Sequence, residues 1–282
     1  MNSLKTWLLM GVLTVILVLF GRLIGGYRGM IFFLILSIVM NFIGYWTSGS
    51  VAIAMTGSRP VSEAELPEVY AIVRRLAHRA NLPMPEIYLT PSMQPNAFAT
   101  GRNPQHAKVA VTEGILRALS TRELEGVLAH EMAHVKNRDI LISSLAAMLA
   151  GVITSIANML QWAMMFGFNG GRDDDRGNVA AEIAMVILAP IAATLVQLAI
   201  SRTREFKADA VGARLVGDAN PLADALERLD AYAHRIPGEF NPATSHLFIV
   251  NPFRGESLLR LFSTHPPTEE RVRRLRNMRI LG

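Results

Sequence analysis

The chain has 282 residues, of which 51% are hydrophobic and only 18% are charged, and its formal net charge is +5. Four long stretches, 6–21, 29–58, 140–171 and 183–201, contain no Asp, Glu, Lys or Arg. This distribution excludes a plain soluble globule and a disordered chain, and the lack of cysteine excludes a disulfide scaffold and any thiolate metal site. The composition therefore indicates soluble segments joined to membrane spans. We attribute the basic balance to anionic lipid headgroups and expect no nucleic-acid partner.

Residues 1–47 are predicted to form an N-terminal transmembrane hairpin. A span needs about 20 apolar residues, and residues 6–24 and 30–47 are close to that length, with Arg22 placed to snorkel to the interface. Trp46 stands near the end of the second run, where aromatic residues favour the bilayer surface. Because a second span follows at once and no clear cleavage site separates the two, we predict an uncleaved anchor.

A second hairpin is predicted over residues 140–201. Two apolar runs, 140–163 and 179–201, flank the glycine-rich, charged segment FNGGRDDDRGN, which is typical of a short loop outside the bilayer. The many small residues in these runs leave an alternative open, in which the pair packs as helices on the surface of the protein and is only membrane-associated. With four transmembrane helices in two hairpins, both soluble segments lie on the side of the N-terminus.

Charge near the spans predicts the orientation, because Lys and Arg are enriched on the cytoplasmic side. The side that carries the soluble segments has seven such residues and the opposite side has four. The seven are Lys5, Arg59, Lys136, Arg138, Arg202, Arg204 and Lys207, and the four are Arg22, Arg28, Arg172 and Arg176. We therefore expect a multi-pass membrane protein whose soluble segments lie in the cytoplasm.

Residues 48–139 are predicted to be the first half of an α+β, mostly helical domain. Capping boxes at Ser62 with Glu65 and at Ser120 with Glu123 predict that a helix begins at each serine. Three short strands are predicted between these helices, over 86–90, 96–101 and 107–112, and would form a small antiparallel or mixed sheet.

Residues 202–282 are predicted to be the second half of the same domain and nearly all helical. Pro266 and Pro267 are expected to start a last, basic helix with the sequence TEERVRRLRNM.

The sequence His130-Glu131-Met132-Ala133-His134 is the strongest chemical signal. Residues four apart share one helical face, so both imidazoles can bind one metal ion, and Glu131 lies beside the place of an attacking water. There it can take a proton from the water and pass it to the leaving amine. The alternative is a helix with two unrelated histidines.

A catalytic zinc site needs a third protein ligand, which in a cysteine-free chain must be His, Asp or Glu. The best candidate is Glu205, followed on the same face by Asp209, which can accept a hydrogen bond from a ligand histidine. The alternative is that these carboxylates only balance the nearby Arg202, Arg204 and Lys207. Because Glu205 follows the returning hairpin and would then face the HExxH sequence, we favour its interpretation as a metal ligand.

Five blocks together carry a resemblance to a known family: NAFATG, VAVTEGIL, HEMAHVKNRD, SRTREFKADA and STHPPTEERV. They resemble the HtpX family of membrane zinc metallopeptidases, which is related to the CAAX prenyl endopeptidases and to gluzincins. The resemblance implies a zincin-type domain holding one Zn²⁺ per chain on His130, His134 and Glu205. It implies Glu131 as the general base and Asp209 as the carboxylate behind a ligand.

The same resemblance implies roles for residues that the sequence alone would leave as structural. Asn96 and Ala97 match an edge strand that binds substrate, and His265 and Arg271 match a block near the oxyanion, with His265 counted as catalytic. By resemblance, the substrates are polypeptides, in particular misfolded or damaged membrane proteins. The location it implies is a bacterial inner membrane, with the catalytic domain in the cytoplasm. Two alternatives remain: a processing protease of the prenyl-protein type, and a non-catalytic scaffold that holds zinc.

Overall fold

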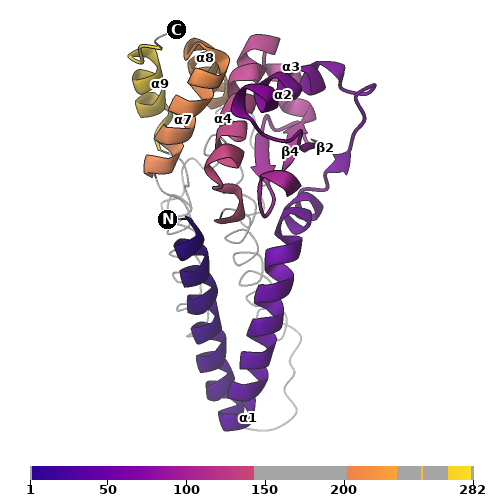
Figure 1. Ribbon diagram of the computed structural model, residues 1–282, viewed down its shortest axis with the longest axis vertical. Helices are drawn as coiled ribbons and strands as arrows, with labels where there is room; N and C mark the ends of the chain where they lie inside the picture. The colour runs from indigo at the N-terminus through magenta and orange to yellow at the C-terminus, as the bar shows by residue number, and fades with distance from the viewer. Residues whose placement is uncertain (1, 143–201, 234–248, 250–265, 281–282) are drawn as a thin grey trace.

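The computed structural model describes residues 2–142, 202–233, 249 and 266–280. A long helical hairpin extends from a domain in which helices surround a small sheet (Figure 1). The predicted segments 143–201, which would contain the second hairpin, and the residue His265 lie outside the described residues.

The hairpin is helix α1 (Asn2–Met55), interrupted at Gly25 and Gly26. Gly26 has φ 57° and ψ −140°, a backbone conformation that only glycine adopts readily, so the chain can reverse there. The side chain of Asn41 donates hydrogen bonds to Oγ1 of Thr14 at 3.0 Å and to the carbonyl of Met10 at 3.3 Å, which ties the two arms together. The reversal falls between the two predicted apolar runs.

In the described part of the chain, one segment, Gly25–Thr47, is long and apolar enough to cross a membrane. α1 continues beyond this segment to Met55, and its last turns pack on the sheet. Ala52 and Ile53 are buried with Tyr88, Phe98 and Ala110 in a separate apolar cluster. The domain is therefore held directly on the end of the apolar helix.

The sheet contains strands β1 (Arg59–Pro60), β2 (Glu86–Thr90), β3 (Ala97–Thr100) and β4 (Lys108–Thr112), in the order β1-β2-β4-β3. β2 and β4 are parallel, and the other two pairs are antiparallel, so the predicted mixed sheet and its three strands are confirmed. The two-residue β1 was not predicted. A short 3₁₀ helix, η1 (Pro104–His106), lies between β3 and β4. β3 is an edge strand.

Helix α4 is the centre of the domain and contacts α2, α7, α8 and the edge strand β3 (Figure 1). Its residues Val127, Leu128 and Met132 are fully buried, and burial of each such side chain contributes about 1.5–3 kcal/mol. The helix that carries His130 and His134 is therefore firmly fixed. The described helices after α1 are α2 (Pro67–Ala80), α3 (Glu113–Ala118), α4 (Thr121–Asn137), α7 (Arg202–Val216), α8 (Asn220–Ala233) and α9 (Thr268–Arg276).

One predicted helix start is confirmed and the other is wrong. Ser120 and Glu123 form a complete capping box at the start of α4. The backbone N–H of Ser62 does donate to the side chain of Glu65, but the helix begins only at Pro67. The residue before a proline is disfavoured in the helical conformation, so no helix runs through Leu66, while proline itself suits the first helical position.

Candidate metal centre

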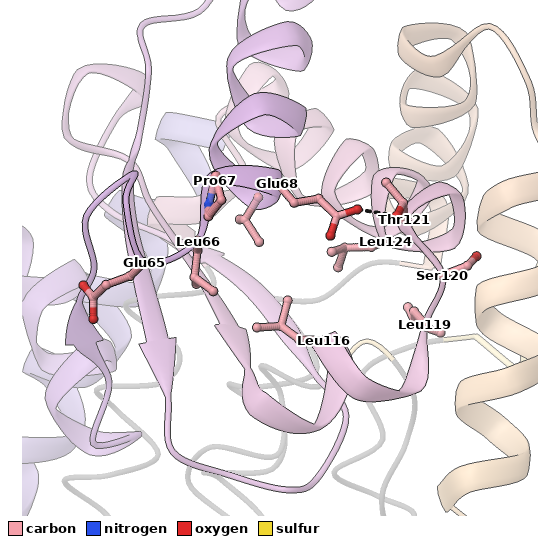
Figure 2. Close-up of a pocket in the computed structure, with 10 residues that line it drawn as sticks. Glu65, Leu66, Pro67, Glu68, Leu116, Leu119, Ser120, Thr121 and Leu124 are labelled. Atoms are coloured by element: carbon pink, nitrogen blue, oxygen red, sulfur yellow. Dashed lines mark hydrogen bonds between the residues drawn. The ribbon is translucent and has the colours of Figure 1, made fainter.

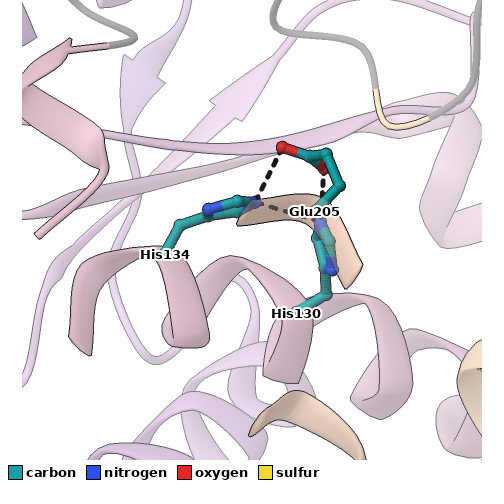
Figure 3. Close-up of side chains that lie close together, drawn as sticks. All are labelled: His130, His134 and Glu205. Atoms are coloured by element: carbon teal, nitrogen blue, oxygen red, sulfur yellow. Dashed lines mark hydrogen bonds and ion pairs between the residues drawn. The ribbon is translucent and has the colours of Figure 1, made fainter. Parts of the chain in front are cut away.

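His130 and His134 lie one turn apart on α4, and their Nε2 atoms are 3.1 Å from each other. Glu205 reaches them from the first turn of α7. Its Oε2 is 3.5 Å from Nε2 of His130, and its Oε1 is 3.6 Å from Nε2 of His134 (Figure 3). The three side chains thus offer donor atoms that lie within 4.8 Å of one another. The structure brings together the residues that the sequence nominated as ligands.

Gly212 allows α7 to approach α4 this closely. A Cβ atom at Gly212 would lie 2.9 Å from the backbone nitrogen of His130, closer than packed atoms tolerate. Glu205, Asp209 and Gly212 share one face of α7, because residues three and four apart are neighbours on a helix. Close helix contact at Gly212 therefore directs both carboxylates at the histidine-bearing turn of α4.

The geometry fits a tetrahedral zinc ion. Ligand atoms at 2.0–2.2 Å from a tetrahedral metal are about 3.3–3.6 Å apart. The two histidine–glutamate separations, 3.5 and 3.6 Å, lie in this range, and the histidine–histidine separation of 3.1 Å is slightly shorter. No cysteine is needed, since two histidines and one carboxylate form a known catalytic ligand set with one open position.

The local charge also favours a divalent cation. Four buried carboxylates lie in or against the cluster, those of Glu131, Asp139, Glu205 and Asp209, each 4–6% exposed. Among the described residues, the positive charges of two arginines interact with these carboxylates. Arg271 is buried, and the charge of Arg204 interacts with those of Asp139 and Glu205. Buried charge requires a partner. A doubly charged cation would balance the remaining negative charge.

Behind His130 lies a chain of charged groups. Oδ1 of Asp209 is 2.8 Å from Nδ1 of His130, and Arg271 donates to both oxygens of Asp209, at 2.7 and 3.0 Å. Burial opposes the charge on Asp209, but the Arg271 charge and the His130 hydrogen bond hold its pKa well below the usual range. Asp209 therefore stays ionised. An ionised acceptor at Nδ1 fixes the tautomer of His130 that leaves Nε2 for the metal.

His134 is also surrounded by acidic groups. Nδ1 of His134 is 3.4 Å from Oδ2 of Asp139. Burial opposes protonation, but the charge of Glu205 and the contact with Asp139 raise the pKa of His134 to about 10. The pKa of His130 is raised as well, against the effect of burial, by Asp209 and Glu205. Both imidazoles therefore lie in surroundings that favour positive charge.

Glu131 is 6% exposed and is held by the edge strand. The backbone N–H of Ala99 in β3 donates to Oε2 of Glu131 at 2.9 Å. One carboxylate oxygen is thus fixed by the protein, and the residue lies beside His130 in sequence. The contact with Ala99 was not predicted, because nothing in the sequence pairs residues 32 positions apart.

Of the residues whose roles the resemblance alone implies, the structure describes Asn96, Ala97 and Arg271. Asn96 is buried, and its Oδ1 accepts a hydrogen bond from the N–H of Ile249 at 3.1 Å, while Ala97 begins the edge strand β3. Arg271 was expected near the oxyanion. Its guanidinium is buried behind Asp209, and it also donates to the carbonyl of Ile249 at 2.9 Å. Asn96 and Arg271 thus hold the backbone of Ile249 from two sides.

A separate pocket of about 430 Å³ lies between the start of α2 and the corner between α3 and α4 (Figure 2). Leu66, Leu116 and Leu124 contribute to its apolar lining, and Glu65 and Glu68 also line it. None of the residues that line this pocket belongs to the histidine–glutamate cluster.

Two histidines with a glutamate between them on one helix, joined by a glutamate from a second helix, are typical of an HExxH metallopeptidase. A model of peptidase family M48 matches residues 63–279. The chain is 58% identical over 283 residues to a protease HtpX homolog of Pelotomaculum thermopropionicum, covering 99% of this chain and 100% of that protein. It is 52% identical over 275 residues to a protease HtpX homolog of Pyrococcus furiosus, covering 97% and 95%. The chain belongs to peptidase family M48.

A solved structure shares the fold. The crystal structure of S. mikatae Ste24p aligns with a TM-score of 0.53 and 19% sequence identity, covering 97% of this chain and 64% of that one. Membership of peptidase family M48 and the similarity to HtpX proteases make the protein a metalloprotease.

Proposed function

We propose that this protein is a membrane-anchored, zinc-dependent endopeptidase that cleaves membrane proteins, in particular misfolded or damaged ones, at the cytoplasmic surface. The observation that carries the proposal is the convergence of His130, His134 and Glu205 beside a glutamate that a backbone amide holds in place. A structural zinc site usually has four protein ligands and no use for a base. Three donors with an adjacent carboxylate favour hydrolysis over a scaffold role.

In this proposal Glu131 is the general base. A zinc ion at the three donors would act as a Lewis acid that polarises the scissile carbonyl and lowers the pKa of water. Glu131 takes one proton as the water oxygen bonds to the carbonyl carbon, and it then delivers this proton to the amine nitrogen when the C–N bond breaks. The N–H of Ala99 orients the carboxylate for both transfers.

The membrane location is supported by the way α1 joins the domain. Trp46 lies next to the end of the apolar segment, and the guanidinium of Arg102, in the turn after β3, lies 4.2 Å from the centre of its ring. Tryptophan and arginine both favour the bilayer interface. The edge strand and the metal site then lie close to the membrane surface, where segments of membrane proteins leave the bilayer.

Replacing Glu131 with glutamine tests the proposed mechanism. Glutamine keeps the size and hydrogen-bonding capacity but cannot accept the proton, so Glu131→Gln should lower casein hydrolysis by at least about 100-fold. The purified full-length variant should still contain one zinc per chain by metal analysis. Glu125→Gln is the matched control on the same helix and should behave as the wild type. Hydrolysis by Glu131→Gln near the wild-type rate would exclude Glu131 as the base.

A further inference from the structure

Helix α4 ends in a turn that places a second carboxylate behind the metal cluster. The N–H of Arg138 donates to the carbonyl of Val135 at 3.1 Å, and the N–H of Asp139 donates to the carbonyl of His134 at 2.9 Å. Arg138 has φ 58° and ψ 38°, in the left-handed region. These features define a Schellman motif, which brings the second residue after the helix back over the residue five positions earlier. Those two residues are Asp139 and His134.

Two other described helices also end in a left-handed turn, with more ordinary residues. At the end of α2, Asn81 has a left-handed backbone, and the N–H of Leu82 donates to the carbonyl of Ala77. Ala77 belongs to the hydrophobic core, and Leu82 packs against it. At the end of α7, Gly217 is left-handed and Asp218 donates to Ala213. Glycine and asparagine tolerate this backbone, and an apolar contact across the turn is usual.

The turn at Arg138 departs from this pattern in two respects. In the described part of the chain, Arg138 is the one residue other than glycine and asparagine with a left-handed backbone. That conformation costs about 1–2 kcal/mol for an L-residue with a full side chain. The contact across the turn is also polar rather than apolar, because it joins a histidine to an aspartate. Strained backbone that persists in a fold points to a functional demand on the site.

The contact has the geometry of an orienting hydrogen bond. Oδ2 of Asp139 is 3.4 Å from Nδ1 of His134, while Nε2 of the same ring faces Glu205 and His130. The side chain of Asp139 is only 5% exposed. His130 has the same arrangement, with Asp209 at 2.8 Å from its Nδ1. Each histidine thus has a buried carboxylate at Nδ1 and directs Nε2 at the metal position.

We infer that Asp139 is a positioning residue for His134, as Asp209 is for His130, and that the turn at Arg138 serves to deliver it. This inference rests on the metal site proposed above. A carboxylate at Nδ1 holds the proton on that nitrogen, so the lone pair of Nε2 is directed at the metal, and it increases the basicity of the ligand. Because its contact is longer than that of Asp209, Asp139 contributes less to metal affinity than Asp209 does.

The test is the zinc affinity of the full-length protein in detergent, measured by competition with a chelating dye. Asp139→Ala should weaken zinc binding by about tenfold, at the low end of the range for such partners, and Asp209→Ala should weaken it more. Asp139→Asn keeps an oxygen that can accept from Nδ1 and should recover part of the loss. Thermal unfolding of the metal-free proteins reports separately on the stability of the helix end.

Asp218→Ala is the matched control, because Asp218 occupies the equivalent position after α7 but lies over Ala213. It should lower thermal stability without changing zinc affinity. If Asp139→Ala and Asp139→Asn both bind zinc within about twofold of the wild type, Asp139 is only a helix-end residue and the inference is overturned. If Asp139→Ala fails to fold, Asp139→Asn, which keeps the shape of the turn, is the deciding variant. Zinc binding clearly weaker than that of the wild type then supports the inference, and binding within about twofold of the wild type overturns it. The activity of Glu131→Gln tests the proposed function independently of these affinities.

Discussion

The backbone N–H of Ala99 donates a hydrogen bond to the carboxylate of Glu131, and this bond joins the edge strand β3 to the central helix α4. β3 pairs with β4 on its other side, and Phe98 packs against Ala52 and Ile53 of α1. The strand that fixes the carboxylate is thus itself fixed by the helix that extends from the apolar hairpin. The position of Glu131 therefore depends on contacts that reach the apolar hairpin.

Ala99→Pro should lower kcat while zinc remains bound. Proline removes the N–H that holds Glu131, and an edge strand tolerates proline where the N–H points away from its neighbour. A hydrogen bond to a charged group contributes about 1.5–3 kcal/mol, so a decrease in kcat of about 10- to 100-fold is expected. The measurement is casein hydrolysis together with zinc content. Ala99→Gly keeps the N–H and is the control; equal kcat for both variants would contradict the role of this bond.

Arg271→Ala should strongly destabilise the metal-free protein. Removing the guanidinium leaves Asp209 charged and buried without its main partner, which costs about 3–5 kcal/mol. Arg271→Lys should be less harmful, because it keeps the charge but loses the paired hydrogen bonds to both carboxylate oxygens. Thermal unfolding measures both. Arg276→Ala, on the exposed face of the same helix, should change stability by no more than about 1 kcal/mol. A loss for Arg271→Ala as small as that of Arg276→Ala would show that Asp209 does not need Arg271.

The metal-free protein should lose stability as the pH rises above neutrality. Because the pKa of His134 is raised to about 10 in the folded state, from about 6.5 in an unfolded chain, its protonation stabilises the fold fully below pH 6.5. This contribution is lost as the pH rises through 10. Thermal unfolding at pH 6, 8 and 10 should show a falling melting temperature, and His134→Gln should reduce the fall. A wild-type melting temperature that does not change over this range would contradict the shift.

Single cysteines in this cysteine-free chain should report the membrane topology. With the domain in the cytoplasm and a second hairpin over 140–201, Gln105→Cys, which is exposed in η1, should react with an impermeant maleimide only after the cells are opened. Asp174→Cys should react in intact cells. Protection of Asp174→Cys in intact cells, together with labelling in opened cells, would contradict four spans and favour a hairpin that covers the domain.

The sequence predicted the helices and strands where local signals are strong. The capping box at Ser120 was confirmed because it needs only residues within one turn. The box at Ser62 failed as a helix start because Pro67, two residues after Glu65, constrains the backbone of Leu66 more strongly than the cap favours a helix. Local patterns thus predict an element well when no stronger local constraint competes.

The amino-acid sequence alone determined which residues lie together on α4, since the spacing of His130 and His134 is a property of any helix. It also nominated Glu205 and Asp209, which share a face of α7 for the same reason. Only the tertiary structure decided how α7 lies against α4, where Ala99 meets Glu131, and what Arg271 and Asp139 contact. Those relationships join elements far apart in the chain, or follow from a left-handed turn at an arginine. Both depend on packing and backbone geometry that no short stretch of sequence specifies.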